Sequence, residues 1–129
     1  MSDSERVKYW IDLASEDFDV AKSLFESRKY LYCGFFCHIS VEKALKAKIA
    51  ATSCTPPKDH NLMKLAKFGG LDNIMSSEQA DLLTLLNPLQ IEARYPTYKE
   101  QLQELLTSDY CKDLLKRTEE MIIWIEKQL

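Results

Sequence analysis

The stretch that decides the fold is residues 30–53, which reads YLYCGFFCHISVEKALKAKIAATS. Placed on a helix at 100° per residue, its first half is apolar on almost every side. A helix of that kind must be buried on several sides. We therefore expect either the central helix of a bundle or a helix shared with a second subunit. A polar stripe interrupts it at steps of four residues, formed by His38, Glu42 and Lys46.

The flanking sequence predicts further helices. Apolar residues recur at three- and four-residue steps from about Ser4 to Ser27, with Ser4 as the expected N-cap. The same periodicity predicts a last helix from about Ser108 to Lys127. Leu102, Leu105 and Leu106 suggest a short helix just before it.

Proline, glycine and serine divide the middle of the chain. The Pro56-Pro57 pair ends the central helix, and a short helix capped by Asp59 is expected over residues 60–68. Another helix begins after Ser76 or Ser77 and is bent or limited by Pro88. The prediction is a single all-α domain, residues 1–129. It is an up-and-down antiparallel bundle of four long helices plus one or two short helices.

Composition narrows the function classes. The chain has 129 residues, 46% of them hydrophobic and 29% charged, and a net charge of −3. These are the proportions of a globular domain, and they argue against broad DNA binding. No apolar run is long enough for a membrane helix, and residues 1–9 do not resemble a signal peptide. We expect a cytoplasmic protein without membrane contact.

Common cofactor motifs are missing from the sequence. Three glycines cannot build a phosphate-binding loop, and no His-Glu-x-x-His or Cys-x-x-Cys pattern occurs. We expect the four cysteines to be reduced, buried thiols. No cofactor and no metal site are predicted.

Two groups of residues offer chemistry. In the first, Arg94 provides a planar fork for phosphate, while Tyr95 and Tyr98 provide stacking faces and hydroxyls for a nucleotide. The alternative is that Arg94 pairs with Glu92 or Asp17 and the tyrosines pack the bundle.

The second group is the polar stripe of His38, Glu42 and Lys46. As a site, it places an imidazole, a carboxylate and an ammonium on the wall of a cleft, with His60 at the rim. As structure, Glu42 and Lys46 form an ordinary ion pair one helical turn apart. The position of this polar stripe on an otherwise apolar helix favours a functional role.

The order and spacing of four stretches resemble the HEPN domains (higher eukaryotes and prokaryotes nucleotide-binding), of the type associated with minimal nucleotidyltransferases. The stretches are Trp10 with Ala14, Asp17 and Ala21; residues 30–47, above all CHISVEKALKA at 37–47; PPKDHNL at 56–62; and ARYP at 93–96. Together they span most of the chain.

The resemblance implies a helical bundle of four or five helices that forms a homodimer. Many such proteins are bacterial or archaeal and act with a minimal nucleotidyltransferase, often as a toxin–antitoxin pair. Many relatives are metal-independent ribonucleases that use an arginine and, after a short polar spacer, a histidine. Here Arg94 matches the arginine, but no histidine follows it and Tyr98 stands near the expected position.

The leading hypothesis is therefore a dimeric HEPN-like protein without the usual ribonuclease pair, which binds a nucleotide or RNA, partners a nucleotidyltransferase, or does both. Its expected ligand-binding residues are Asp17, His38, Glu42, Lys46, His60, Arg94, Tyr95 and Tyr98. One alternative is an active endoribonuclease toxin that uses Arg94 with Tyr98 or with a histidine from elsewhere in the fold. Another is a non-catalytic dimeric interaction module held together through Tyr32, Phe35 and Phe36.

Overall fold

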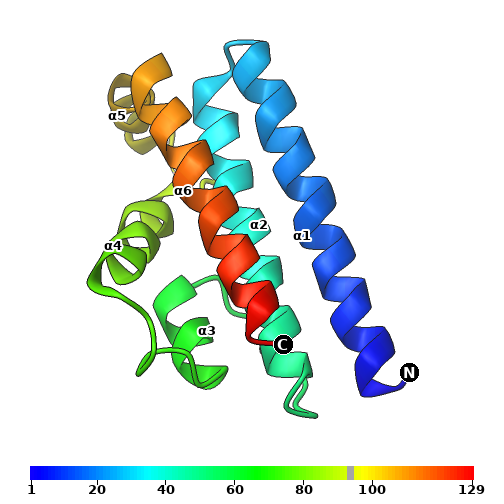
Figure 1. Cartoon of the computed structure of the whole chain (residues 1–129). Helices are drawn as coiled ribbons and strands as arrows, with labels where there is room; N and C mark the ends of the chain where they lie inside the picture. Colours follow the sequence, from blue (N-terminus) through cyan, green and yellow to red (C-terminus); the bar gives the residue numbers. More distant parts are fainter. Residues whose placement is uncertain (93–94) are drawn as a thin grey trace.

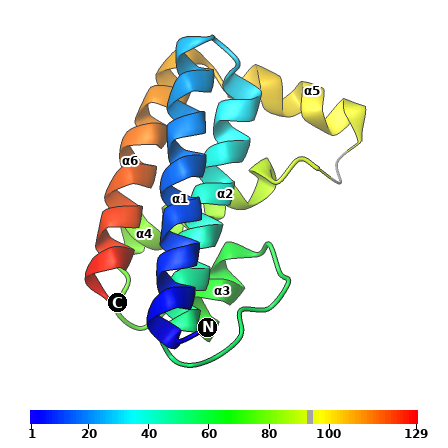
Figure 2. The same cartoon turned by 90° about the vertical axis from the view of Figure 1, so that its right-hand side faces the viewer.

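Three long helices lie side by side in the computed structural model, which describes residues 1–92 and 95–129 (Figures 1 and 2). They are α1 (Asp3–Glu26), α2 (Tyr30–Ala50) and α6 (Ser108–Lys127). α1 and α2 are antiparallel, whereas α6 runs in the same direction as α2 (Figure 1).

Shorter elements carry the chain back along α2 before α6 begins. They are α3 (Leu62–Phe68), α4 (Ser77–Leu86), the 3₁₀ turn η1 (Asn87–Leu89) and α5 (Pro96–Leu105). No β-strand occurs in the part of the chain that the structure describes. The predicted all-α bundle is confirmed, with α4 and α5 only ten residues long each. Pro88 and Pro96 explain these lengths, because the first follows the end of α4 and the second begins α5.

α2 is the centre of the molecule. Most of its residues are buried, and it contacts every other helix. The prediction of a central helix is confirmed within one chain, so its burial needs no second subunit. Its polar stripe consequently faces protein rather than solvent, because the helix has almost no exposed side.

The structure corrects two of the predicted N-caps. Ser2, not Ser4, caps α1, because its hydroxyl accepts from the backbone of Glu5 while the Glu5 carboxylate accepts from the backbone of Ser2. Asn61, not Asp59, caps α3 by accepting from the backbone of Lys64.

Asp59 has a different task, because its side chain accepts from the backbone N–H of Asn61 at 2.9 Å. This is a local turn of the kind that aspartate favours. His60 is the middle residue of this turn.

Among the described residues, no helix combines the length and apolar character that crossing a bilayer requires.

Candidate functional site

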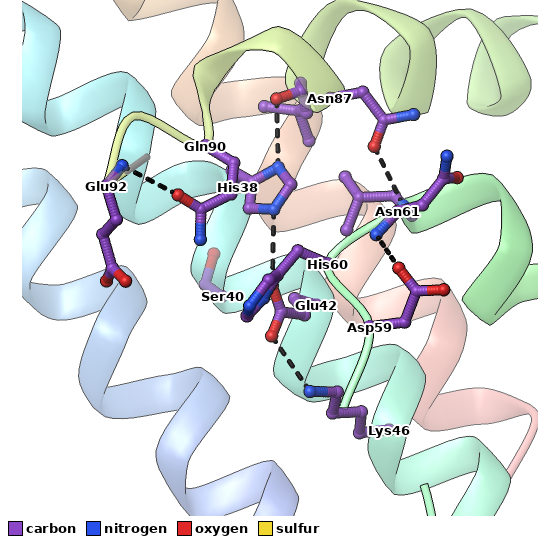
Figure 3. A network of polar contacts seen from close by, with 12 residues as sticks. His38, Ser40, Glu42, Lys46, Asp59, His60, Asn61, Asn87, Gln90 and Glu92 are labelled. Carbon is purple, nitrogen blue, oxygen red and sulfur yellow. Dashed lines mark hydrogen bonds and ion pairs between the residues drawn. The ribbon is translucent and has the colours of Figure 1, made fainter. Parts of the chain in front are cut away.

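A single carboxylate, that of Glu42 on α2, stands at the centre of a polar network (Figure 3). Its Oε1 accepts from His60 Nδ1 at 3.0 Å, and its Oε2 accepts from Lys46 Nζ at 3.1 Å. Only 3% of the Glu42 side chain is exposed. A buried carboxylate needs such partners, because leaving one unpaired is costly.

His38 contacts the same carboxylate from one helical turn earlier and has no exposed surface. Its Nδ1 donates to the carbonyl of Leu86 at 3.0 Å, since a carbonyl oxygen only accepts. Its Nε2 faces Glu42 Oε1 at 3.3 Å, an ion-pair distance without the angles of a good hydrogen bond. Both ring nitrogens therefore face acceptor oxygens. The ring also ties α2 to the end of α4.

These contacts decide the charge of Glu42. Burial alone would raise the pKa of Glu42, but the His38 and His60 contacts and the Lys46 ammonium outweigh burial and lower it to about 2. The carboxylate is thus ionised at neutral pH.

On the side that faces α1, two lysines of α2 lie over the ring of Trp10 from α1. Lys46 Nζ and Lys43 Nζ lie 5.6 and 5.8 Å from the centre of the Trp10 ring. Both distances suit cation–π attraction. Nearby, burial raises the pKa of the partly buried Asp17, while the charge of Lys43 opposes that shift.

A pocket of about 460 Å³ opens beside His60. It lies between the loop before α3, the segment around η1 and the first turn of α5. Most of its lining residues are of polar types, although apolar atoms supply the larger part of the lining surface; they are His60, Asn61, Asn87, Pro88, Gln90, Glu92 and Tyr98. Its two walls are joined, because the backbone N–H of Leu62 donates to Asn87 Oδ1 at 2.9 Å.

The predicted site residues take different places. His60 and Tyr98 line the pocket, while His38, Glu42 and Lys46 lie buried behind His60. These three were expected to line the cleft, and they support its wall instead, because α2 is packed on nearly all sides. Figure 3 shows the three side chains following one another along α2, with the His60 ring next to Glu42.

Two of the remaining three candidates, Asp17 and Tyr95, do not line the pocket. Asp17 lies on α1 beside Lys43, and Tyr95 is 82% exposed. Arg94 lies outside the described residues, so its proposed contact with phosphate stays a prediction.

Sequence reasoning missed the amide residues of the pocket, Asn61, Asn87 and Gln90. Asn87 precedes a proline at a helix end, which is a weak signal for a functional polar side chain. Nothing in the spacing links it to His60. Only the return of the chain after α4 brings the two together.

A protein-family model for the HEPN domain matches residues 7–128 of the chain. The chain belongs to the HEPN family. Two solved structures support the same fold for this HEPN protein. The protein TT1696 from Thermus thermophilus has a TM-score of 0.82 at 18% identity, with 96% of this chain and 98% of that chain covered.

The second solved structure is ST0689, described as an archaeal HEPN homologue. It has a TM-score of 0.72 at 16% identity, with 95% of this chain and 96% of that chain covered. A search of curated proteins gave no match. At these identities the two structures speak for the fold alone.

Over residues 1–92 and 95–129, no three His, Cys, Asp or Glu side chains gather so that they could hold a metal ion. The functional groups that the site offers are an imidazole, amides, a phenol ring and buried charged groups.

Proposed function

We propose that this HEPN protein binds a nucleotide, free or within a single strand of RNA, in the pocket beside His60. The observation that carries the proposal is the meeting of Tyr98, His60 and three amide side chains on one concave surface. Its volume of about 460 Å³ falls within the range of small-molecule sites. An aromatic ring offers a stacking face to any base.

Two of the amides have a fixed orientation. Asn87 Oδ1 accepts from Leu62 N, and Asn61 Oδ1 accepts from Lys64 N. The amide nitrogen of each residue therefore remains as a donor on a side chain that lines the pocket. Such donors suit the carbonyl oxygens of a base or the oxygens of a phosphate.

The binding test compares two tyrosines of the same segment. We expect calorimetric titration with ATP and with a short single-stranded RNA to detect binding to the wild-type protein by at least one of them. Tyr98→Leu should weaken that binding about 5- to 150-fold, the cost of losing one stacked base. Tyr95→Leu is the matched control, because Tyr95 is 82% exposed and does not line the pocket.

Each outcome has a clear reading. Equal losses in the two variants would contradict this pocket as the binding site. Absence of binding by the wild-type protein to both ligands would contradict the proposed function. Circular dichroism of both variants checks that the helices remain folded.

The family resemblance adds partners to the proposal. We propose a homodimer and a minimal nucleotidyltransferase as the protein partner, in a toxin–antitoxin type of pair. Light scattering of the purified protein tests the dimer. Co-expression with a transferase encoded beside it tests the pairing, and separate elution of the two proteins would contradict it.

A further inference from the structure

We propose that the pocket beside His60 selects guanine, and that the carboxylate of Glu92 makes the selection by accepting hydrogen bonds from N1–H and the 2-amino group of the base. This inference rests on the proposed function, because it needs a nucleotide in the pocket. It adds which base the pocket takes and which side chain distinguishes that base from the others. Glu92 is an exposed residue between η1 and α5, and it lines the pocket.

The lining of the pocket suits a base rather than a phosphate. Apolar atoms supply the larger part of its surface, as a flat aromatic base requires. As far as the structure describes the lining, it contains the carboxylate of Glu92 and no lysine or arginine. Cationic side chains are the strong partners of phosphate in proteins, whereas a nearby carboxylate repels it. We therefore place the base in the pocket and the phosphate on the side away from Glu92.

Stacking and the amide donors do not distinguish one base from another. The ring of Tyr98 can stack on any base, because every base has a π face. Asn61 Oδ1 and Asn87 Oδ1 accept from backbone N–H groups, so these two amides contribute donors to the pocket. Every base has acceptor atoms for such donors. Selection must therefore come from the acceptors of the lining, which meet the donor groups of the base.

The strongest acceptor of the lining is the carboxylate of Glu92. In the described part of the chain, no hydrogen bond or ion pair engages this side chain. An ionised carboxylate only accepts, and it offers two oxygens side by side. His60 in its neutral form offers a single acceptor, Nε2, because its Nδ1 donates to Glu42 at 3.0 Å. Glu92 is thus the lining group that can pair with two adjacent donors.

Guanine is the base that matches a pair of acceptor oxygens. Its N1–H and 2-amino group are neighbours and point the same way, so both can donate to one carboxylate in a charge-assisted, bidentate pair. Adenine and cytosine each have a ring nitrogen acceptor beside the amino group, and uracil has carbonyl oxygens on both sides of its N–H. In these three bases, one carboxylate oxygen would face another acceptor, which is repulsive.

The remaining polar atoms of guanine also find suitable partners. N7 and O6 are acceptors, and the amides of Asn61 and Asn87 are donors. Figure 3 shows Glu92 on one side of His60 and these two amides on the other. The backbone of Glu92 is held in place, because its N–H donates to Gln90 Oε1 at 3.0 Å. The pocket therefore offers an acceptor wall and a donor wall to the two kinds of edge that guanine has.

The first test compares five ligands that differ only in the base, the 5′-monophosphates of guanosine, inosine, adenosine, cytidine and uridine. In calorimetric titration of the full chain, we expect guanosine monophosphate to bind about 10- to 100-fold more tightly than the adenosine, cytidine and uridine compounds. Inosine monophosphate lacks only the 2-amino group. It should bind about 10-fold more weakly than guanosine monophosphate, the effect of removing one hydrogen bond to a charged acceptor.

The second test removes the selecting carboxylate. Glu92→Gln should lower the affinity for guanosine monophosphate about 10- to 100-fold and leave the affinity for adenosine monophosphate nearly unchanged. The difference between guanosine and inosine monophosphate should shrink in this variant, because the 2-amino group no longer meets a carboxylate. Glu104→Gln is the matched control, since it removes the same charge from an exposed residue of α5 that does not line the pocket. If Glu92→Gln does not fold, the comparison of guanosine with inosine still carries the test.

The outcomes distinguish this inference from the proposed function. Binding of ATP or RNA without a preference for guanosine monophosphate would overturn the selection of guanine and leave the binding site in place. A full guanosine preference in Glu92→Gln, or its loss in Glu104→Gln, would overturn the role of Glu92. Absence of binding to the monophosphates, to ATP and to RNA would overturn both proposals.

Discussion

One residue, Glu42, connects the sequence signal, the stability of the core and the pocket. Its carboxylate is shared by three nitrogens that come from α2 and from the loop before α3. The sequence offered two interpretations of the stripe that contains it, a site or an ion pair. The geometry joins them, because the buried ion pair is what holds the exposed His60.

At the residue scale, we expect Glu42 to make the protein sensitive to acid. The pKa of Glu42 falls from 4.5 to about 2 on folding, so its contribution to stability is fully present above about pH 4.5 and is lost as the pH falls towards 2. The free energy of unfolding in urea should therefore drop between pH 5 and pH 3 more steeply in the wild type than in Glu42→Gln.

The same substitution should already destabilise the protein at pH 7. Removing the carboxylate leaves the buried Lys46 ammonium without its ion-pair partner, at a cost of about 3–5 kcal/mol. Glu16→Gln on the exposed part of α1 should keep the wild-type pH dependence. Equal slopes for Glu42→Gln and the wild type would contradict the assigned role of Glu42.

At the element scale, the sequence predicted periodic helices better than their first residues. The bounds predicted for α6 agree with the structure, because a long amphipathic pattern ends clearly on both sides. The cap of α4 stayed open between Ser76 and Ser77, since neighbouring serines give the same signal. The structure selects Ser76, because Gln79 three residues later completes a reciprocal cap.

We expect the two serines to differ in their effect on stability. Ser76→Ala should lower the free energy of unfolding by about 1 kcal/mol, because it leaves the backbone N–H of Gln79 without its acceptor. Ser77→Ala should change it by less than about 0.5 kcal/mol, since Ser77 is an exposed residue inside the first turn. Urea unfolding followed by circular dichroism measures both, and equal effects would rule out the assigned cap.

The lining of the pocket could be predicted only in part from the sequence of the separate elements. The sequence singled out His60 and Tyr98, both of which line the pocket, because each belongs to a distinctive short pattern. It did not single out Asn87 and Gln90, because their place in the pocket comes from the position of η1 next to the loop before α3. That placement rests on contacts distant in sequence, such as His38 with Leu86 and Leu62 with Asn87. No local periodicity contains them.

At the scale of the whole molecule, α2 is the shared partner of all the other helices. It packs against each of them, so displacing α2 removes contacts from every other helix. The apolar character of residues 30–53 predicted either this central position or a helix shared with a second subunit, and the structure shows the central position. The order in which α3, α4 and α5 return along α2 was not predictable, because it depends on short helices with few residues to specify their packing.

The central position of α2 predicts a single unfolding transition that one substitution moves as a whole. Trp10 on α1 and Trp124 on α6 report on two different partners of α2, and circular dichroism reports on all helices. We expect fluorescence and circular dichroism to give the same urea midpoint.

Leu45→Ala, at a residue with no exposed surface, should lower the free energy of unfolding by about 2–5 kcal/mol for both probes. Leu105→Ala, at a residue 49% exposed, should lower it by less than about 1 kcal/mol. Midpoints that separate in Leu45→Ala would mean that α1 and α6 unfold independently, against the central role of α2.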